Sequence, residues 1–146
     1  MLLVALGYTI LPHTTDAYIE ATGATFDEAL EQAAVGLFDT LCDVIAISPH
    51  LTEEIEVRGN DDVNLLFSWL ETLLLKFELE GKVYSRFHVS RIIVSNEEMV
   101  ATARISGEQY NKQKHGAKVE VKAVTYHKME IIHDIPSTTV RFILDL

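Results

Sequence analysis

The spacing of hydrophobic residues along the chain changes character near residue 82. Before that point, two stretches repeat apolar residues every three or four positions, which is typical of amphipathic helices. The first begins at a capping box, Thr25-Phe26-Asp27-Glu28. The second runs through Trp69 to Gly81, and its apolar residues cover more than half of the helix circumference. We therefore expect a surface helix and a more deeply buried helix, both packed on a sheet.

Strands are predicted where apolar and polar residues alternate or where β-branched and aromatic residues gather. These stretches are residues 1–13, 17–23, 54–57, 84–94, 99–106, 119–129 and 139–146. Two helices in the first half and a run of strands after them favour an α+β fold, with the helices packed on a mostly antiparallel or mixed sheet. A chain of 146 residues has the length of one domain, so residues 1–146 are predicted to form a single domain.

The stretch from Val119 to Met129 differs from the other predicted strands. Neither of its two alternating faces is cleanly apolar, because Lys122, Thr125 and His127 occupy mid-strand positions where a structural strand favours Val or Ile. These polar side chains make the stretch a candidate functional surface.

The net charge of −10 is unevenly distributed along the chain. Residues 1–81 contain 15 acidic and 2 basic side chains, whereas residues 82–146 contain 7 acidic and 10 basic ones. This balance argues against direct, phosphate-driven binding to nucleic acid. An acidic half is suited to docking on a basic protein, such as an enzyme that handles RNA or DNA. The alternative is that the acidic residues only keep the protein soluble.

Several classes of protein are excluded by composition. The single Cys42 lies in an apolar helical pattern, so we expect a buried structural thiol and neither a disulfide framework nor a cysteine-based zinc site. No targeting segment is visible, and no apolar run approaches the ~20 residues that span a bilayer. The protein is therefore expected to be soluble and cytoplasmic, without membrane association.

Carboxylates gather at positions that a fold could bring together. Asp145 is the penultimate residue of an otherwise apolar strand, and Leu146 adds the terminal carboxylate beside it. If the first and last strands are neighbours, Asp16 joins them, and a hard divalent cation such as Ca²⁺ or Mg²⁺ would relieve the repulsion. The alternative is an exposed terminal Asp and a turn Asp that makes a local hydrogen bond.

The remaining polar residues do not complete a catalytic set. The six histidines lack the spacing of a zinc signature, and no phosphate-binding loop or nucleophile motif occurs. His13 is either a supporting partner of Asp16 or a turn residue, and His127 is either a hydrogen-bonded strand residue or a ligand. Lys122 is either a functional cation or a salt-bridged strand lysine.

Three motifs, in this order along the chain, resemble those of the archease family. His13-Thr14-Thr15-Asp16 is similar to the family's His-Thr-Ala-Asp motif, and Lys122-Ala123-Val124-Thr125-Tyr126-His127 resembles its hallmark strand. The chain ends in Asp145-Leu146, where the family ends in Asp and an apolar residue. The two helices and the overall length also follow the archease plan. Thr15 departs from the usual Ala.

Archeases are known as small, non-enzymatic protein cofactors of the tRNA-splicing RNA ligase, and they promote its guanylylation and repeated turnover. The resemblance implies the same role here, with the ligase as the protein partner. It also implies a metal site built by Asp16, Asp145 and the carboxylate of Leu146, for which Ca²⁺ is the first expectation and Mg²⁺ the second. Lys122 is implied as a further functional position. Beside such a carboxylate cluster, His127 is left with a structural or supporting role, and His13 keeps the two roles given above.

Two other functions remain open from the sequence. One is a metal-dependent phosphoester hydrolase that uses His13, Asp16 and Asp145. The other is a chaperone-like module for a different RNA-modifying enzyme, for example a tRNA methyltransferase.

Overall fold

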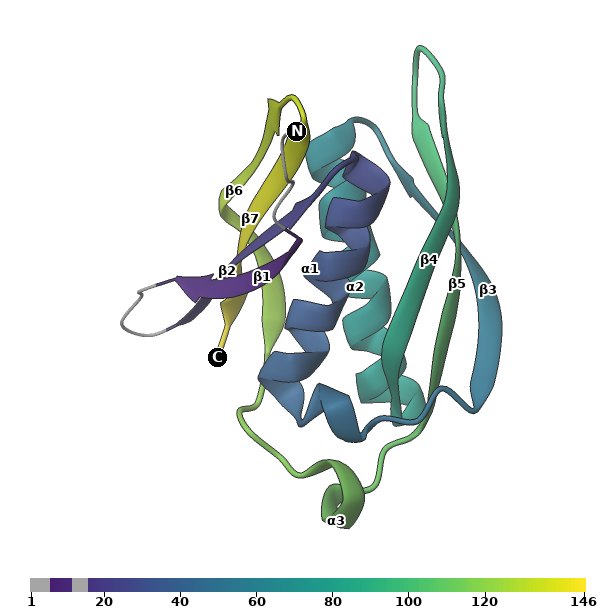
Figure 1. The fold of residues 1–146 in the computed structure, drawn as a ribbon, viewed down its shortest axis with the longest axis vertical. Coiled ribbons are helices and arrows are strands. Elements are labelled where there is room, and N and C mark those ends of the chain that lie inside the picture. Colours follow the sequence, from purple (N-terminus) through teal and green to yellow (C-terminus); the bar gives the residue numbers. More distant parts are fainter. Residues whose placement is uncertain (1–5, 12–15) are drawn as a thin grey trace.

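The computed structural model describes residues 6–11 and 16–146. Two long helices lie between two β-sheets, so the described chain forms three layers (Figure 1). The helices are α1 (Phe26–Leu41), α2 (Asp62–Glu80) and the short α3 (Lys112–His115), and a 3-10 turn (Val44–Ala46) follows α1. The predicted α+β fold is confirmed. Residues 1–5 and 12–13 of the first predicted strand lie outside the described part.

Both sheets are antiparallel throughout. The first has the strand order β1-β2-β7-β6, and the second has the order β3-β5-β4. The strands are β1 (Gly7–Leu11), β2 (Asp16–Gly23), β3 (Leu51–Gly59), β4 (Lys82–Val94), β5 (Met99–Gln109), β6 (Ala123–Asp134) and β7 (Ser137–Asp145).

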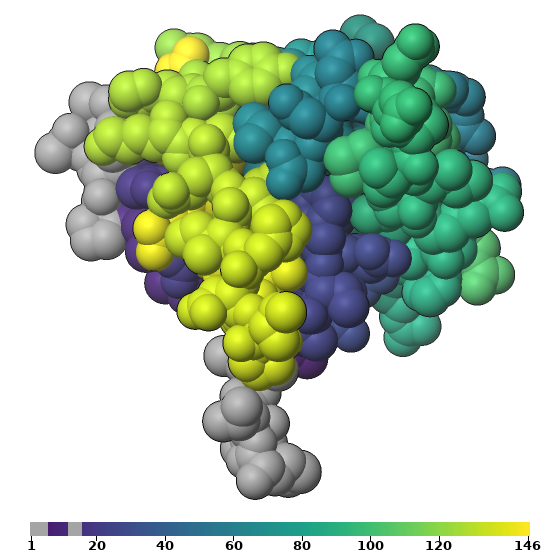
Figure 2. Space-filling view, turned by 90° about the horizontal axis from the view of Figure 1, so that it is seen from above, coloured from purple at the N-terminus to yellow at the C-terminus, as the bar shows by residue number. Residues whose placement is uncertain are grey.

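The sequence pattern predicted one sheet, whereas the structure divides the strands between two sheets. α1 packs against β2 on one side and β4 on the other, and α2 packs against β6 and β3. Each helix therefore buries apolar residues in two directions. Seen from above, the β6–β7 and β4–β5 hairpins flank the molecule, and the starts of both helices reach the surface between them (Figure 2).

Local sequence signals set the helix ends. The Thr25 hydroxyl accepts the Glu28 N–H (3.2 Å), and the Glu28 carboxylate accepts the Ala24 N–H (2.7 Å), as the capping box predicts. Asp61 caps α2 by accepting the N–H of Asn64 (2.8 Å). Gly81 ends α2 in the left-handed conformation (φ 66°), which glycine adopts without steric cost.

The core fills the space between the helices and the sheets. Trp69 is completely buried, and its indole N–H donates to the carbonyl of Leu30 (2.8 Å), which links α2 to α1. Cys42 is buried as predicted, and desolvation raises the pKa of its thiol to about 11. None of the described helices is long and apolar enough to cross a membrane.

The predicted strand at 119–129 is wrong in its first part, because β6 begins only at Ala123. The residues before β6 lie beside the C-terminal end of α1, where the N–H of Lys118 donates to the carbonyl of Leu41 (3.0 Å). Val121 is buried in the core, whereas Val119 is 44% exposed. A contact with a helix end therefore replaces the ladder that the alternating pattern predicts.

Candidate functional site

The two chain-end aspartates lie on neighbouring strands. Asp16 is the first residue of β2 and Asp145 the last of β7, and the two are direct partners in the antiparallel register. Directly opposed residues point to the same face, with Cβ atoms about 4.5–5.5 Å apart. Because Leu144 points into the core, Asp145 and Asp16 point away from the helices. The structure therefore brings these two carboxylates together, through β2 and not through the first strand, β1.

A hollow of about 260 Å³ lies beside this pair on the outer face of the sheet. It is lined by Asp16, Ala123, Thr125, His127, Ile143 and Asp145. Ala123 and Thr125 on β6 are the register partners of Asp145 and Ile143 on β7. Ile143 is 1% exposed although it does not belong to the main core, so it forms an apolar floor under the carboxylates.

An irregular segment of β6 brings His127 to this hollow. Regular pairing with β7 stops at Thr125 and resumes at Glu130, so residues 126–129 bulge out of the ladder. The N–H of His127 donates to the Thr125 hydroxyl (3.0 Å), and Lys128 takes a left-handed conformation (φ 56°). The alternating pattern predicted a regular strand at His127, and that prediction is wrong because of this bulge.

The bulge is anchored on α2 and on β2. The Tyr126 ring stacks on Phe67 with ring centroids 4.0 Å apart, and its hydroxyl accepts a hydrogen bond from the Asn64 amide (2.5 Å). The ammonium of Lys128 lies 5.9 Å from the centroid of the Tyr18 ring, within the range of a cation–π contact. The side chains beside the hollow are therefore held by packing rather than by the sheet ladder.

Lys122 and Leu146 flank the end of β7. The N–H of Lys122 donates to the carbonyl of Asp145 (2.7 Å), so the backbone of Lys122 lies against the residue that carries the second carboxylate. Its side chain is exposed and makes no ion pair with the residues that the structure describes. Leu146 packs its side chain against the core, and its carboxylate follows Asp145 directly. His13 lies outside the described residues, so its supporting role stays a prediction.

The donors at the chain ends are all oxygen atoms. Within residues 6–11 and 16–146, no group of three or more His, Cys, Asp or Glu side chains could hold a metal ion. The predicted set instead combines two aspartates with the terminal carboxylate, and such oxygen donors suit Ca²⁺ or Mg²⁺ better than zinc. Ca²⁺ takes about six to eight oxygen ligands, so water or a partner protein would complete the shell. The metal site stays a prediction.

A half-buried polar cluster around Glu108, in which the His115 side chain is fully buried, was not predicted from the sequence. The Glu108 carboxylate accepts hydrogen bonds from Lys114 (2.6 Å), from His115 Nε2 (2.8 Å) and from the N–H of Ser48 (2.8 Å). These donors, Lys114 first, lower the pKa of Glu108 to about 2. His115 Nδ1 accepts the N–H of Asn111 (2.9 Å), so its proton is on Nε2. The cluster fastens α3 to β5.

The chain is similar to known proteins over nearly its whole length. Residues 8–146 match the model of the archease protein family. The archease of Sulfolobus acidocaldarius is 33% identical over 139 residues, which cover 95% of this chain and 98% of the relative. The archease of Pyrococcus furiosus is 40% identical over 119 residues, which cover 82% and 83%.

Solved structures show the same fold. The solution structure of Methanobacterium thermoautotrophicum protein 1598 matches with a TM-score of 0.80 and 29% identity over 96% of this chain and 99% of that one. The crystal structure of an archease from Thermotoga maritima, described as a possible chaperone, matches with a TM-score of 0.56 and 21% identity over 94% and 96%. From the family match across residues 8–146 and relatives above 30% identity, it follows that this chain belongs to the archease family.

Proposed function

We propose that this protein is a non-enzymatic cofactor that activates a tRNA-splicing RNA ligase, promoting guanylylation of the ligase and its multiple turnover. Membership of the archease family supports the proposal, as do the three motifs through which the sequence resembles that family. The description of the Thermotoga maritima protein as a possible chaperone is consistent with an action on another protein.

The observation that carries the proposal is the cross-strand pairing of Asp16 with Asp145 at the edge of an outward-facing hollow. The half-buried carboxylate of Asp16, the exposed carboxylate of Asp145 and the terminal carboxylate beside them are suited to hold a divalent cation, Ca²⁺ first and Mg²⁺ second. In this proposal, Asp16, Asp145 and Leu146 hold the ion, and Lys122 faces the ligase. The cation would neutralise the carboxylates while they dock near the metal and nucleotide site of the ligase.

The described lining of the hollow favours a cofactor over a hydrolase. Apart from the two carboxylates, its polar groups are Thr125 and His127, and the Thr125 hydroxyl accepts the backbone N–H of His127. No nucleophile paired with a base is present among the described lining residues. The net charge of −10 also favours a basic protein partner over direct contact with RNA phosphates.

A ligation assay tests the proposal. A purified RNA ligase is mixed with RNA ends in several-fold molar excess, with and without this protein. The number of joined products per ligase molecule is then measured. Wild type is expected to raise the product above one per ligase, and Asp16→Ala or Asp145→Ala to remove the increase. Asp134→Ala, which removes an exposed carboxylate at the far end of β6, is the matched control. Full stimulation by both hollow variants, or phosphoester turnover by this protein alone, would refute the proposal.

A further inference from the structure

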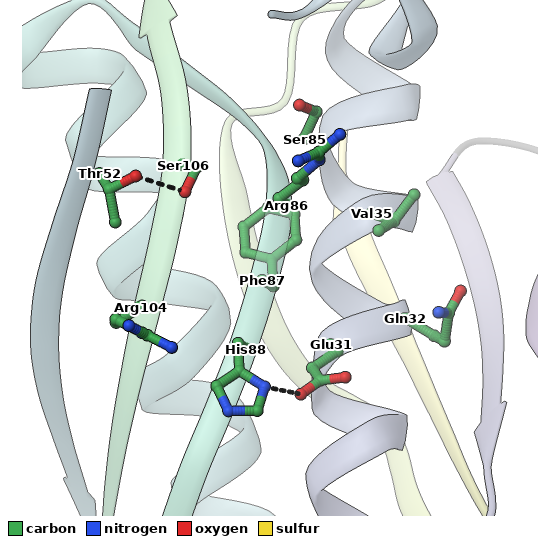
Figure 3. Close-up of a pocket in the computed structure, with 10 residues that line it drawn as sticks. All are labelled: Glu31, Gln32, Val35, Thr52, Ser85, Arg86, Phe87, His88, Arg104 and Ser106. Carbon is green, nitrogen blue, oxygen red and sulfur yellow. Dashed lines mark hydrogen bonds and ion pairs between the residues drawn. The ribbon is translucent and has the colours of Figure 1, made fainter. Parts of the chain in front are cut away.

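The second sheet carries a larger hollow, far in the fold from the paired aspartates. It has a volume of about 500 Å³ and lies over β4 and β5 where the edge of β4 meets α1 (Figure 3). It is lined by Glu31, Gln32, Val35, Thr52, Ser85, Arg86, Phe87, His88, Arg104 and Ser106. This volume lies within the range of about 300–1,000 Å³ that is typical of small-molecule sites.

The arginines of this sheet differ from the others in the chain. Two of the five arginines, Arg58 and Arg141, each bridge two glutamates. Within the described part of the chain, Arg86, Arg91 and Arg104 make neither an ion pair nor a side-chain hydrogen bond. Acidic residues outnumber basic ones by 22 to 12, so three guanidinium groups without a carboxylate on one sheet face indicate a place for an external anion.

The strand register places two of these arginines together over the hollow. Arg86 is the partner of Ser106, and Arg104 is the partner of His88, so the two arginines are diagonal neighbours on β4 and β5. Diagonal neighbours lie about 7–8 Å apart, a distance that long side chains can close around one ligand. The hydroxyls of Ser106 and Thr52 are hydrogen-bonded to each other (2.8 Å) and lie next to Arg86. Hydroxyl groups can also donate hydrogen bonds to an anion.

Glu31 carries the only carboxylate that lines the described hollow, and its contacts hold it on one side of the hollow. Glu31 accepts the N–H of Val89 (2.8 Å) and lies 4.0 Å from His88 Nδ1, away from both arginines (Figure 3). Desolvation by burial raises the pKa of the Glu31 carboxyl, while the Val89 N–H and His88 act in the opposite direction. Val35 and Phe87 give the hollow an apolar side next to its cationic groups.

We propose that this hollow binds the phosphate group of a small organic phosphate of mononucleotide size, with Arg86 and Arg104 as the phosphate ligands. Arginine forms a planar fork of donors that matches phosphate oxygens. A small ligand suits an acidic chain better than a long polyanion does, since charges farther away than about 8 Å are largely screened at physiological salt. This proposal does not rest on the proposed action on a ligase, because phosphate binding can be measured with this protein alone.

Arg91 offers a matched control for the position of the site. It lies on the same face of β4 and also makes no described ion pair, but it does not line the hollow. Arg91→Ala therefore removes the same charge as Arg86→Ala or Arg104→Ala without removing a proposed ligand. Glu31→Gln removes the carboxylate from the hollow and keeps an oxygen that can accept the Val89 N–H.

The full-length protein is titrated with adenosine 5′-monophosphate, and binding is measured by isothermal titration calorimetry and by changes in NMR chemical shifts. Adenosine, inorganic phosphate and a short RNA without terminal phosphates are titrated in parallel. The monophosphate is expected to bind and to shift the amides of β4 and β5, with no binding of adenosine. Each of Arg86→Ala and Arg104→Ala is expected to weaken binding about tenfold, as for a charge-assisted hydrogen bond. Arg91→Ala should leave the affinity unchanged, and Glu31→Gln should tighten it.

Other outcomes would overturn the proposal. No binding of the monophosphate, equal binding of adenosine, or an equal loss from Arg91→Ala would each exclude a phosphate site in the hollow. Binding of RNA without binding of the monophosphate would assign the arginines to a nucleic-acid surface instead. Circular dichroism of each variant excludes unfolding as the cause of a lost signal.

Discussion

Asp16 and Asp145 stand directly opposite each other at the open end of the β2–β7 pair. Like charges in this arrangement destabilise a sheet, because opposed side chains on one face lie within about 4.5–5.5 Å. The apolar floor of Ile143 beneath them does not offset the repulsion, and a bound cation would. The stability of the chain should therefore depend on divalent ions through these two residues.

The change Asp145→Asn should have opposite effects with and without metal. In the presence of a chelator it should stabilise the fold by roughly 0.5 kcal/mol, since one of two opposed charges is removed. With Ca²⁺ at a hundred times its dissociation constant, wild type should gain about 2.7 kcal/mol and the variant much less. Thermal unfolding followed by the fluorescence of the buried Trp69 measures both effects. Asp134→Asn is the control, and an equal gain from Ca²⁺ in Asp145→Asn would exclude the site.

The change Lys122→Ala should separate partner contact from folding. The Lys122 side chain is exposed and only its backbone contacts Asp145, so the midpoint of thermal unfolding should change little. Stimulation of the ligase should fall at least about fivefold, as for the loss of one charged contact at an interface. Lys112→Ala on α3, also exposed, serves as the control, and an equal loss from both lysines would indicate a general charge effect.

Features set by neighbouring residues could be predicted from the sequence. The capping box at Thr25 and the glycine at position 81 act within one helical turn, and they fix the start of α1 and the end of α2 as expected. The approach of Asp16 to Asp145 was predicted only on the condition that the first and last strands are neighbours, with Asp16 in a turn before the strand at 17–23. In detail it is the second strand, β2, that borders β7, and β1 lies beyond it.

Features set by distant contacts could not be predicted. The late start of β6 depends on the contact between Lys118 and the end of α1, which alternation along the chain does not encode. The bulge that moves His127 depends on the stacking of Tyr126 on Phe67 of α2. The hollow around Arg86 depends on a register with two irregularities between β4 and β5, so sequence spacing alone does not place it.

The change Gly107→Ala should be among the most damaging single substitutions in the second sheet. A Cβ atom at Gly107 would lie 1.8 Å from the carbonyl oxygen of Val83 and 2.7 Å from the Cα of Tyr84. Both obstacles are backbone atoms of the paired strand β4, so β4 would have to move. We expect a loss of more than about 3 kcal/mol, measured by urea unfolding. Ser106→Ala, one residue earlier, should cost about 1 kcal/mol through its lost hydrogen bond to Thr52.

The cluster around Glu108 should make the stability of the fold sensitive to acid. The hydrogen bonds from Lys114, the Ser48 N–H and His115 lower the pKa of this carboxyl from 4.5 to about 2 in the folded state. A carboxyl with a lowered folded pKa adds stability above its unfolded pKa and loses it as the pH falls through the folded pKa. Glu108→Gln should therefore lower the free energy of unfolding by about 2 kcal/mol at pH 7, and the difference from wild type should vanish between about pH 4.5 and about pH 2.

Urea unfolding at a series of pH values measures this difference. Glu97→Gln is the matched control, since it removes the same charge from an exposed position in the turn between β4 and β5. Its stability should follow that of wild type at every pH. A Glu108→Gln deficit that stays constant down to pH 2 would show that the lost packing, and not the carboxylate, stabilises the junction between α3 and β5.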